Sequence, residues 1–355
     1  MNPKIRINLK KLAHNAAEMQ KLCASAGIQV SAVTKGFCAK PQAVSALIHG
    51  GIKSLADSRI ENLQRYESTE VEKMLLRLPM ISQVEEVVRF SHISLNSQWS
   101  TIQALNNASK NQGLRHGVIL MADVGDLREG VFGENAFLDL VRKTSQLSHV
   151  QVKGIGTNLT CFGAVIPDEN NLGQLVSLAN QSAELVGSPI ELVSGGNSSS
   201  LSMLLENRLP AGINHLRIGE GILLGTESAY GNKLPGFHQD CFQLVAELVE
   251  VEQKPSMPIG TTGKDAFGQI PHFEDRGVRS RAIAAVGKQD FGTHSIKSLD
   301  EEVEILGASS DHLILDVTDA AKEYRVGDEL TFSLGYGAML ALNTSAYIAT
   351  QFVEG

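Results

Sequence analysis

The sequence predicts an α/β protein in which a (β/α)8 TIM barrel is followed by a C-terminal, mostly antiparallel β domain. Short apolar runs alternate with longer segments of helical spacing from about Gln29 to Gly225, and eight such runs occur there. The pattern changes after Pro235, and 355 residues exceed what one core usually holds. We therefore expect two domains, a barrel at residues 1–236 and a β domain at residues 237–355.

The predicted barrel strands are short runs rich in apolar and β-branched residues. They are Gln29–Val33, Ser54–Ala56, Met74–Leu78, His92–Leu95, Gly117–Ala122, Gln151–Ile155, Pro189–Val193 and His215–Ile218. Segments with apolar residues at positions i, i+3 and i+4 lie between them and predict amphipathic helices. These segments are Gln42–His49, Val84–Phe90, Ser100–Lys110, Ala136–Gln146 and Leu172–Leu185. A further helix is expected to begin at Asn8, before the first barrel strand.

The region after Pro235 has a different character. The apolar runs Phe242–Val251, Val278–Val286 and His312–Val317 are separated by Gly, Pro and Asp clusters, and no long helical pattern lies between them. Such a pattern is typical of an antiparallel β domain, here about 120 residues long, which is a normal domain size.

Composition excludes several classes of function. The net charge is −8, and no basic run is interleaved with aromatic residues, so we expect neither nucleic acid nor an anionic membrane as a partner. No apolar run is long enough to span a membrane, and the first residues read as a strand and not as an apolar leader, so a cytoplasmic location is expected. Four scattered cysteines without CxxC spacing, and no HExxH pair, predict reduced thiols and no metal site.

Polar residues follow most of the predicted barrel strands. Because a TIM barrel carries its chemistry at the C-terminal ends of its strands, we expect these residues to share one mouth. They are Thr34–Gly36, Asp57–Arg59, Asp123–Arg128, Gly156–Asn158, Ser194–Ser198 and Arg217–Glu220. Cys38 and Cys161 follow two of these sets, and we interpret them as packing residues, with a place in the mouth as the alternative.

Lys35 is the first candidate for chemistry. It stands at the end of an apolar run, where partial burial would lower its pKa and make a neutral amine available for Schiff-base chemistry. The alternative is an ordinary surface lysine in a loop between strand and helix.

Two glycine-bearing turns predict a phosphate site. Ser194–Leu201 combines glycines with small capping residues before a helical segment, and Arg217–Gly221 follows the next strand. The alternative for the first turn is a plain helix cap. Arg128 and Arg217 in the same mouth imply an anionic ligand or an electron-rich ring nitrogen, or else salt bridges to Asp123 or Glu220.

A barrel lysine after the first strand, a phosphate cup near the last two strands and a following β domain together resemble the pyridoxal-phosphate enzymes of the alanine racemase fold. Within that fold the chain looks most like the alanine/ornithine racemase group. The resemblance implies a pyridoxal 5′-phosphate cofactor, a small amino-acid substrate and a homodimer whose active sites are shared between subunits. Val33–Lys35 matches the segment whose lysine bonds covalently to the cofactor.

The resemblance also implies roles for other residues. Asp123–Gly130 is similar to the segment whose arginine lies beside the phenolic oxygen of the cofactor, which gives that role to Arg128. His215–Gly219 looks like the segment whose arginine, here Arg217, contacts the ring nitrogen. The residues with implied phosphate contacts are Asn197, Ser198, Gly219, Glu220 and Tyr336. Ala285–Asp290 occupies the place of a loop that helps to hold the substrate carboxylate.

This sequence departs from the alanine racemases at two positions. Asn158 stands where they have a histidine that stacks on the cofactor ring, which indicates the ornithine-like branch. Thr261 stands where they have the tyrosine base that the partner subunit contributes. Asp265, the nearest acid in that loop, is our candidate for the second catalytic group, with His272 as the next candidate and a solvated loop residue as the alternative for both.

We therefore expect an amino-acid racemase that prefers ornithine or lysine to alanine. Glu220, Asp265, Glu274 and Asp275 are candidates to pair the distal ammonium of such a substrate, or else ordinary surface acids. Two other functions stay open at this point. A decarboxylase or aldolase of the same fold would use the same cofactor, and a non-catalytic pyridoxal-phosphate carrier would use the barrel alone, without a β domain.

Overall fold

The computed structural model describes residues 2–354, and they form two compact units. The barrel unit is Leu9–Gln239, and the sheet unit combines the described residues up to Asn8 with those from Asp240 onward. Within the described residues, no helix is both long enough and apolar enough to cross a membrane.

The barrel unit contains the predicted closed parallel sheet. Its strands are β2 (Gln29–Val33), β3 (Ser54–Asp57), β4 (Glu72–Leu75), β5 (Ile93–Asn96), β6 (His116–Asp123), β8 (Val150–Gly156), β9 (Leu192–Ser194) and β10 (His215–Ile218). They pair in the order β5-β4-β3-β2-β10-β9-β8-β6, and the pairing of β5 with β6 closes the barrel. The two-residue strand β7 (Val131–Phe132) only extends β6. The prediction of an eight-stranded barrel is thereby confirmed.

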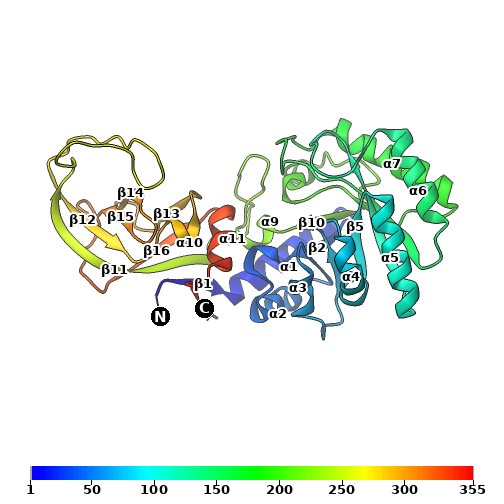
Figure 1. Cartoon of the computed structure of the whole chain (residues 1–355), viewed down its shortest axis with the longest axis horizontal. Coiled ribbons are helices and arrows are strands. Elements are labelled where there is room, and N and C mark those ends of the chain that lie inside the picture. Colours follow the sequence, from blue (N-terminus) through cyan, green and yellow to red (C-terminus); the bar gives the residue numbers. More distant parts are fainter. Residues whose placement is uncertain (1, 355) are drawn as a thin grey trace. The chain divides into compact units, whose positions relative to one another are not determined.

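Helices alternate with these strands along the chain (Figure 1). They are α1 (Leu9–Ser25), α2 (Pro41–His49), α3 (Ile60–Gln64), α4 (Val84–Phe90), α5 (Trp99–Gln112), α6 (Glu134–Ser145), α7 (Glu169–Val186), α8 (Leu201–Leu205) and α9 (Glu220–Leu223), with single 3-10 turns η1 (Lys35–Phe37), η2 (Ile81–Gln83) and η3 (Ser198–Ser200). The longer barrel helices were predicted from the sequence, but α3 and α9 were not, because five and four residues are too few to show a helical period.

The barrel core is made of apolar side chains from successive strands. The buried cluster comprises Val33, Ala56, Met74, Ile93, Leu95, Ile119, Met121 and Leu192. Gly154 on β8 allows β9 to pair closely, because a Cβ at this position would lie 2.6 Å from the carbonyl oxygen of Leu192. This packing fixes the strand ends that carry the polar residues.

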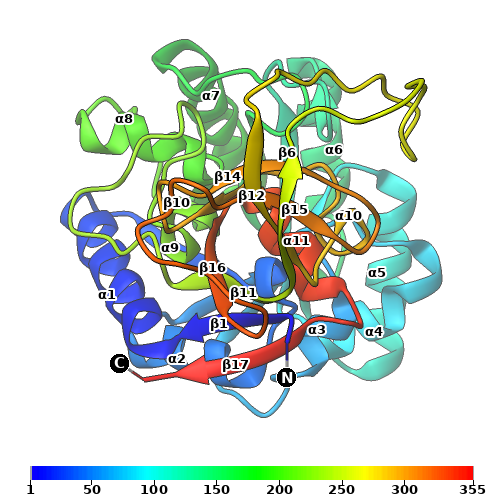
Figure 2. The same ribbon diagram turned by 90° about the vertical axis from the view of Figure 1, so that its left-hand side faces the viewer.

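The sheet unit contains the predicted β domain. Its strands are β1 (Lys4–Asn8), β11 (Phe242–Pro255), β12 (Val278–Ala284), β13 (Ile296–Ser298), β14 (Glu304–Ala308), β15 (Leu313–Asp316), β16 (Glu329–Leu334) and β17 (Ala349–Val353), with α10 (Lys288–Phe291) and α11 (Tyr336–Thr344). All pairings are antiparallel except that of β1 with β17. Figure 2 shows β1 and β17 side by side.

The first strand belongs to the sheet unit, although the sequence analysis counted residues 1–236 with the barrel. β1 pairs with β11 on one side and with β17 on the other. Its sequence alternates charged and apolar residues, so that Ile5 and Ile7 are buried while Lys4 and Arg6 lie at the partly exposed face. The alternation identifies a strand, but it does not say which sheet the strand joins.

Candidate active site

Lys35 begins η1 directly after β2. Burial lowers the pKa of its amine, as the position at a strand end predicts, and Arg128 adds to this lowering. Cys161, Asp57 and Glu129 act in the opposite direction. Side chains at or after the ends of three different strands, β3, β6 and β8, therefore influence the Lys35 amine.

A buried carboxylate fixes the backbone that carries Lys35. The Asp57 carboxylate accepts hydrogen bonds from Thr34 Oγ1 at 2.6 Å, from Asn62 Nδ2 at 3.1 Å and from the Arg59 backbone N–H at 2.9 Å. Burial raises the pKa of Asp57, and these three donors oppose that rise. Because Thr34 precedes Lys35, the carboxylate holds the end of β2 against the end of β3.

Arg217 on β10 is buried and joins three strand ends. Its Nη1 donates to Ser194 Oγ at the end of β9, and its Nη2 donates to the carbonyl oxygen of Thr157 at 2.7 Å and to Asn158 Oδ1 at 3.4 Å. All of these partners are neutral, so Arg217 does not form the salt bridge to Glu220 that the sequence left open. Burial lowers the pKa of Arg217 to about 10.

Arg128 lies near the same group but forms an ion pair. Its guanidinium binds the carboxylate of Glu129, with Nη2 at 2.5 Å from Oε1. Asp123, the alternative partner, instead accepts the backbone N–H groups of Gly125 at 2.9 Å and Leu127 at 3.1 Å. Glu129 was not predicted as a site residue from the sequence. Its position next to Arg128 was the one feature that could have indicated this ion pair.

Two asparagines connect the loops after β8 and β9. Asn197 Nδ2 donates to Asn158 Oδ1 at 2.8 Å, to the carbonyl oxygen of Leu159 at 2.9 Å and to Cys161 Sγ at 3.4 Å. The buried carboxylate of Asp126 holds the same loop through the N–H group of Cys161 at 3.3 Å and two further backbone N–H groups. The structure therefore places Asn158 and Asn197 together, as the sequence predicted.

Cys161 is exposed and lies in this group of residues. Besides its contacts with the two asparagines, it is close enough to influence the pKa values of Lys35 and Arg217. The interpretation of Cys161 as a packing residue was wrong, because a packing cysteine would be buried among apolar side chains. Its spacing of three residues after Asn158 was the signal for the other interpretation.

The turns that follow β9 and β10 lie against each other. Ser198 Oγ accepts the Gly221 N–H at 3.1 Å, and the Asn197 side chain caps η3 by accepting the Ser199 N–H at 2.8 Å. Gly219 packs against β2, where a Cβ would lie 3.3 Å from Val33 Cβ. The turns after β9 and β10, which contain Ser198 and Gly219, are thus held together by their own hydrogen bonds and packing.

The hydroxyl of Ser199, in the same turn as Ser198, is fully buried and has no hydrogen-bond partner among the described residues. A buried hydroxyl without a partner costs about 1–3 kcal/mol. Glu220 follows Gly219 in the second of these turns, where burial raises the pKa of its carboxyl group and Thr226 Oγ1 donates to it at 3.3 Å.

The remaining predicted residues lie in the sheet unit. Tyr336 is the first residue of α11 and is half-buried. Asp265 lies in an exposed loop between β11 and β12, which also contains Thr261 and His272. Its Oδ1 accepts the N–H groups of Gln269 at 2.8 Å and Phe267 at 2.9 Å, and these bonds lower its pKa.

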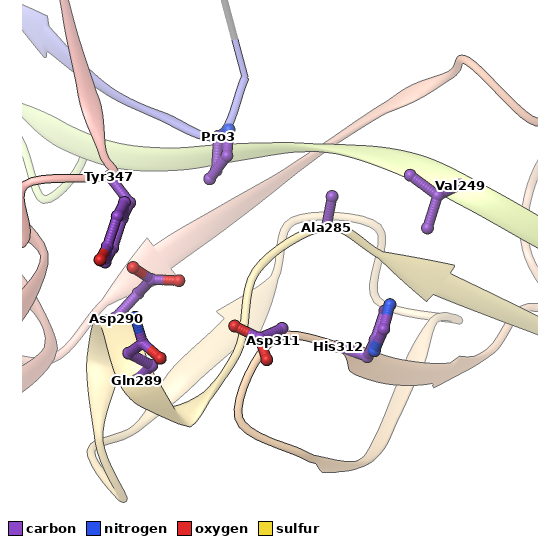
Figure 3. A pocket seen from close by; sticks show the side chains of 8 residues that line it. All are labelled: Pro3, Val249, Ala285, Gln289, Asp290, Asp311, His312 and Tyr347. Carbon is purple, nitrogen blue, oxygen red and sulfur yellow. The ribbon is translucent and has the colours of Figure 1, made fainter.

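The sheet unit also contains an open cavity of about 600 Å³ (Figure 3). Its lining includes Gln289, Asp290, Asp311, His312 and Tyr347. Asp290 accepts a hydrogen bond from Ser345 Oγ at 2.8 Å, and Asp311 accepts one from Ser310 Oγ at 2.6 Å. Because donors of the same unit already engage both carboxylates, we assign no ligand to this cavity.

Comparisons with known proteins identify the family of the chain. A family model described as "Alanine racemase, N-terminal domain" matches residues 7–227. The chain is 45% identical over 353 residues to ornithine racemase of Acetoanaerobium sticklandii, which covers 99% of this chain and 100% of that protein. It is 38% identical over 349 residues to lysine racemase of Thermotoga maritima, with 98% and 97% covered.

Solved structures share the fold. An alanine racemase from Bartonella henselae, solved with covalently bound pyridoxal phosphate, superposes with a TM-score of 0.74 at 17% identity, covering 99% of this chain and 100% of that one. The family match over most of the barrel unit and the identity to two racemases over nearly the full length confirm the resemblance found in the sequence. This chain belongs to the alanine racemase family.

Proposed function

We propose that this chain is a pyridoxal-phosphate-dependent racemase that interconverts the L and D forms of a basic amino acid. The observation that carries the proposal is the Lys35 amine, which is held at the end of β2 with a lowered pKa among residues that suit an anionic, aromatic cofactor. The names of the two full-length relatives, ornithine racemase and lysine racemase, support the substrate class. Of the two substrates we favour ornithine, because the chain is more similar to the ornithine racemase than to the lysine racemase.

The residues of the barrel unit fit pyridoxal phosphate. Ser198 Oγ accepts the Gly221 N–H, which leaves its own proton for a phosphate oxygen, and Gly219 lies in the adjacent turn. Lys35 supplies the amine that bonds to the cofactor. When bound, the cofactor supplies an electron sink for the charge that develops at the substrate Cα.

Arg217 serves specificity as well as binding. A guanidinium has only N–H donors, so at the ring nitrogen it would leave that nitrogen without a proton of its own. This limits how far charge is withdrawn from Cα and thereby disfavours decarboxylation and other side reactions. Although burial lowers the pKa of Arg217 to about 10, the group stays charged at neutral pH.

Lys35 also moves the proton. Because its pKa is lowered, the free Lys35 amine is neutral over a wider pH range than that of an exposed lysine, so it could take the Cα proton on one face of the substrate. Inversion needs a second group that gives a proton to the other face. Asp265 stays our candidate from the sequence, and Cys161 becomes a competitor, because it lies in the same group of residues as Lys35.

We also propose that the enzyme is a homodimer and works in the cytoplasm. The support for the dimer is that Asp265, Thr261 and Tyr336, which the family resemblance links to the active site, all lie in the sheet unit and not in the unit of Lys35. The support for the compartment is that the four cysteines are free thiols.

A single experiment tests the reaction. Purified protein saturated with pyridoxal phosphate is incubated with each pure enantiomer of ornithine, lysine and alanine in deuterated buffer. We expect inversion with one deuterium at Cα, fastest for a basic amino acid, and no carbon dioxide. Lys35→Ala should abolish both the lysine–cofactor absorbance band and inversion. Release of carbon dioxide without inversion would contradict the proposal, and so would a bound cofactor without any exchange at Cα.

A further inference from the structure

A continuous line of hydrogen bonds leads from Arg217 through the barrel wall to the surface. Beyond Ser194, the Ser194 Oγ lies 2.7 Å from His215 Nδ1, and His215 Nε2 lies 2.9 Å from Ser31 Oγ. Ser31 Oγ lies 2.7 Å from Ser54 Oγ, which donates to the exposed Glu72 carboxylate at 3.3 Å. The line thus crosses the neighbouring strands β9, β10, β2, β3 and β4 in turn.

The acceptor end of this line and a neutral His215 ring together fix the direction of its bonds. Arg217 can only donate, and the Glu72 carboxylate can only accept. Because Ser54 gives its one proton to Glu72, Ser31 must donate to Ser54, and the proton between Ser31 and His215 must come from Nε2. His215 Nδ1 is then an acceptor for the Ser194 hydroxyl, whose lone pairs are left for Arg217. One tautomer of neutral His215 satisfies all of these contacts.

The surroundings keep His215 neutral. The side chain is 2% exposed, and burial, together with the charge of Arg217, lowers its pKa to about 3. A charged imidazole would carry a proton on Nδ1 and would compete with Arg217 for the oxygen of Ser194. Ser31 and Ser194 are fully buried, so their hydroxyl groups bond to these protein partners and not to solvent.

We propose that His215 is a positioning residue for Arg217: as the neutral Nε2–H tautomer, it holds the Ser194 hydroxyl so that its oxygen faces the guanidinium. The inference rests on the proposed function, in which Arg217 contacts the cofactor ring. Ser194 and the Thr157 carbonyl oxygen together fix both terminal nitrogens of Arg217. Loss of one of these contacts frees the guanidinium to rotate, and a displacement of about 1 Å in a catalytic site can cost about 10²-fold in rate.

Two amide variants separate this role from simple core packing. His215→Asn places an acceptor oxygen near the position of Nδ1 and keeps the bond to Ser194, whereas His215→Gln places its amide near Nε2 and keeps only the contact to Ser31. We expect His215→Gln to lower kcat about 10- to 100-fold with KM changed less than threefold, and His215→Asn to stay within about threefold of the parent protein.

His116 supplies a matched control. It is a second buried barrel histidine, its Nε2 bonds to Ser94 Oγ at 2.8 Å, and burial lowers its pKa to about 4. It has no bond to Arg217 in the described structure. His116→Gln should therefore lower thermal stability about as much as His215→Gln does, with kcat unchanged. Equal kcat losses in the two Gln variants would overturn the positioning role.

A measurement without cofactor or substrate tests the bond directions directly. In ¹⁵N-histidine spectra of the cofactor-free protein, we expect His215 to show the neutral Nε2–H pattern from pH 5 to pH 8. A neutral Nδ1–H tautomer or a charged ring would overturn the inference even where every variant fails to fold. If the parent protein racemised no amino acid, the proposed function would fail, while these spectra would still decide the arrangement around Ser194.

Discussion

At the scale of single residues, the site depends on groups whose charge is set by burial. Lys35, Arg217 and His215 all have lowered pKa values, and in each case burial is the largest cause. The three effects differ in consequence. The lowered pKa makes Lys35 a usable base and keeps His215 neutral. The pKa of Arg217 stays high enough for the guanidinium to be charged at neutral pH.

The second proton-transfer group can be identified with two substitutions. If Cys161 supplies the proton, Cys161→Ser should lower inversion at least about 100-fold, because a serine hydroxyl is a far weaker acid, while the lysine–cofactor absorbance band persists. If Asp265 supplies it, Asp265→Asn should have that effect instead. Inversion rates and exchange at Cα, measured from each enantiomer, distinguish the two. Full activity in both variants would exclude both residues.

The buried histidines make stability depend on pH. His215 has a folded-state pKa of about 3 and His116 one of about 4, both below the ordinary value of about 6.5. The unfolded chain therefore binds more protons below pH 6.5, and the free energy of unfolding falls as pH falls, by up to about 1.4 kcal/mol per pH unit for each histidine.

The check is urea unfolding of the parent protein and His215→Asn at several pH values between 6.5 and 5. The variant should lose less stability on acidification than the parent protein. His49→Asn, which removes an exposed imidazole, is the control and should follow the parent protein. A fall of the same slope in all three proteins would refute the assignment.

At the scale of elements, α7 shows how a local sequence fixes one end of a helix. Asp168 precedes it and accepts the N–H groups of Asn170 at 2.9 Å and Asn171 at 2.8 Å, while Asn171 Oδ1 accepts the Asp168 N–H at 3.0 Å. Gly187, with a φ of 74°, ends the helix in the left-handed region. This reciprocal cap lies in the connection that leads from the Cys161 loop.

Removing the cap should destabilise the barrel unit by a predictable amount. We expect Asp168→Ala to lower the free energy of unfolding by about 1 kcal/mol and Asp168→Ser to recover most of it, because serine also caps helices well. Denaturant titration followed by circular dichroism measures both. No difference between the two variants would mean that the cap contributes little here.

The sequence was most informative about individual strands and helices. The run Gln29–Val33 and the run His215–Ile218 became β2 and β10 with unchanged bounds, because apolar β-branched runs between polar turns have no competing structure. The site residues after these strands followed from the same periodicity. Glu129 and Cys161 did not, because an ion pair with a sequence neighbour and a thiol in a loop have no periodic pattern.

At the scale of the whole molecule, the two units divide the residues that the family resemblance assigns to one active site. The barrel unit contains Lys35, Arg128 and Arg217, and the sheet unit contains Tyr336 and Asp265. If, as we propose, sheet and barrel units of two subunits together complete each active site, activity should depend on assembly.

Dilution provides the test of that dependence. Specific activity should fall on dilution over the range in which light scattering or sedimentation shows the dimer dissociating, and it should return on reconcentration. Mixing inactive Lys35→Ala with an inactive variant of the sheet unit should restore up to about a quarter of the parent activity, because one hybrid site then has both intact units. A monomer that keeps full activity would contradict the shared site.

The strand β1 has a consequence for how the chain folds. Its five residues pair with β11 and with β17, so that Lys4 lies opposite Val245 on one side and Ala349 on the other. Residues Leu9–Gln239 can complete their own contacts within the barrel unit, whereas the partners of β1 lie more than about 200 positions away along the chain. Because contacts of such long sequence separation form slowly, β1 should enter its sheet late in folding, after the barrel unit that follows it in the sequence.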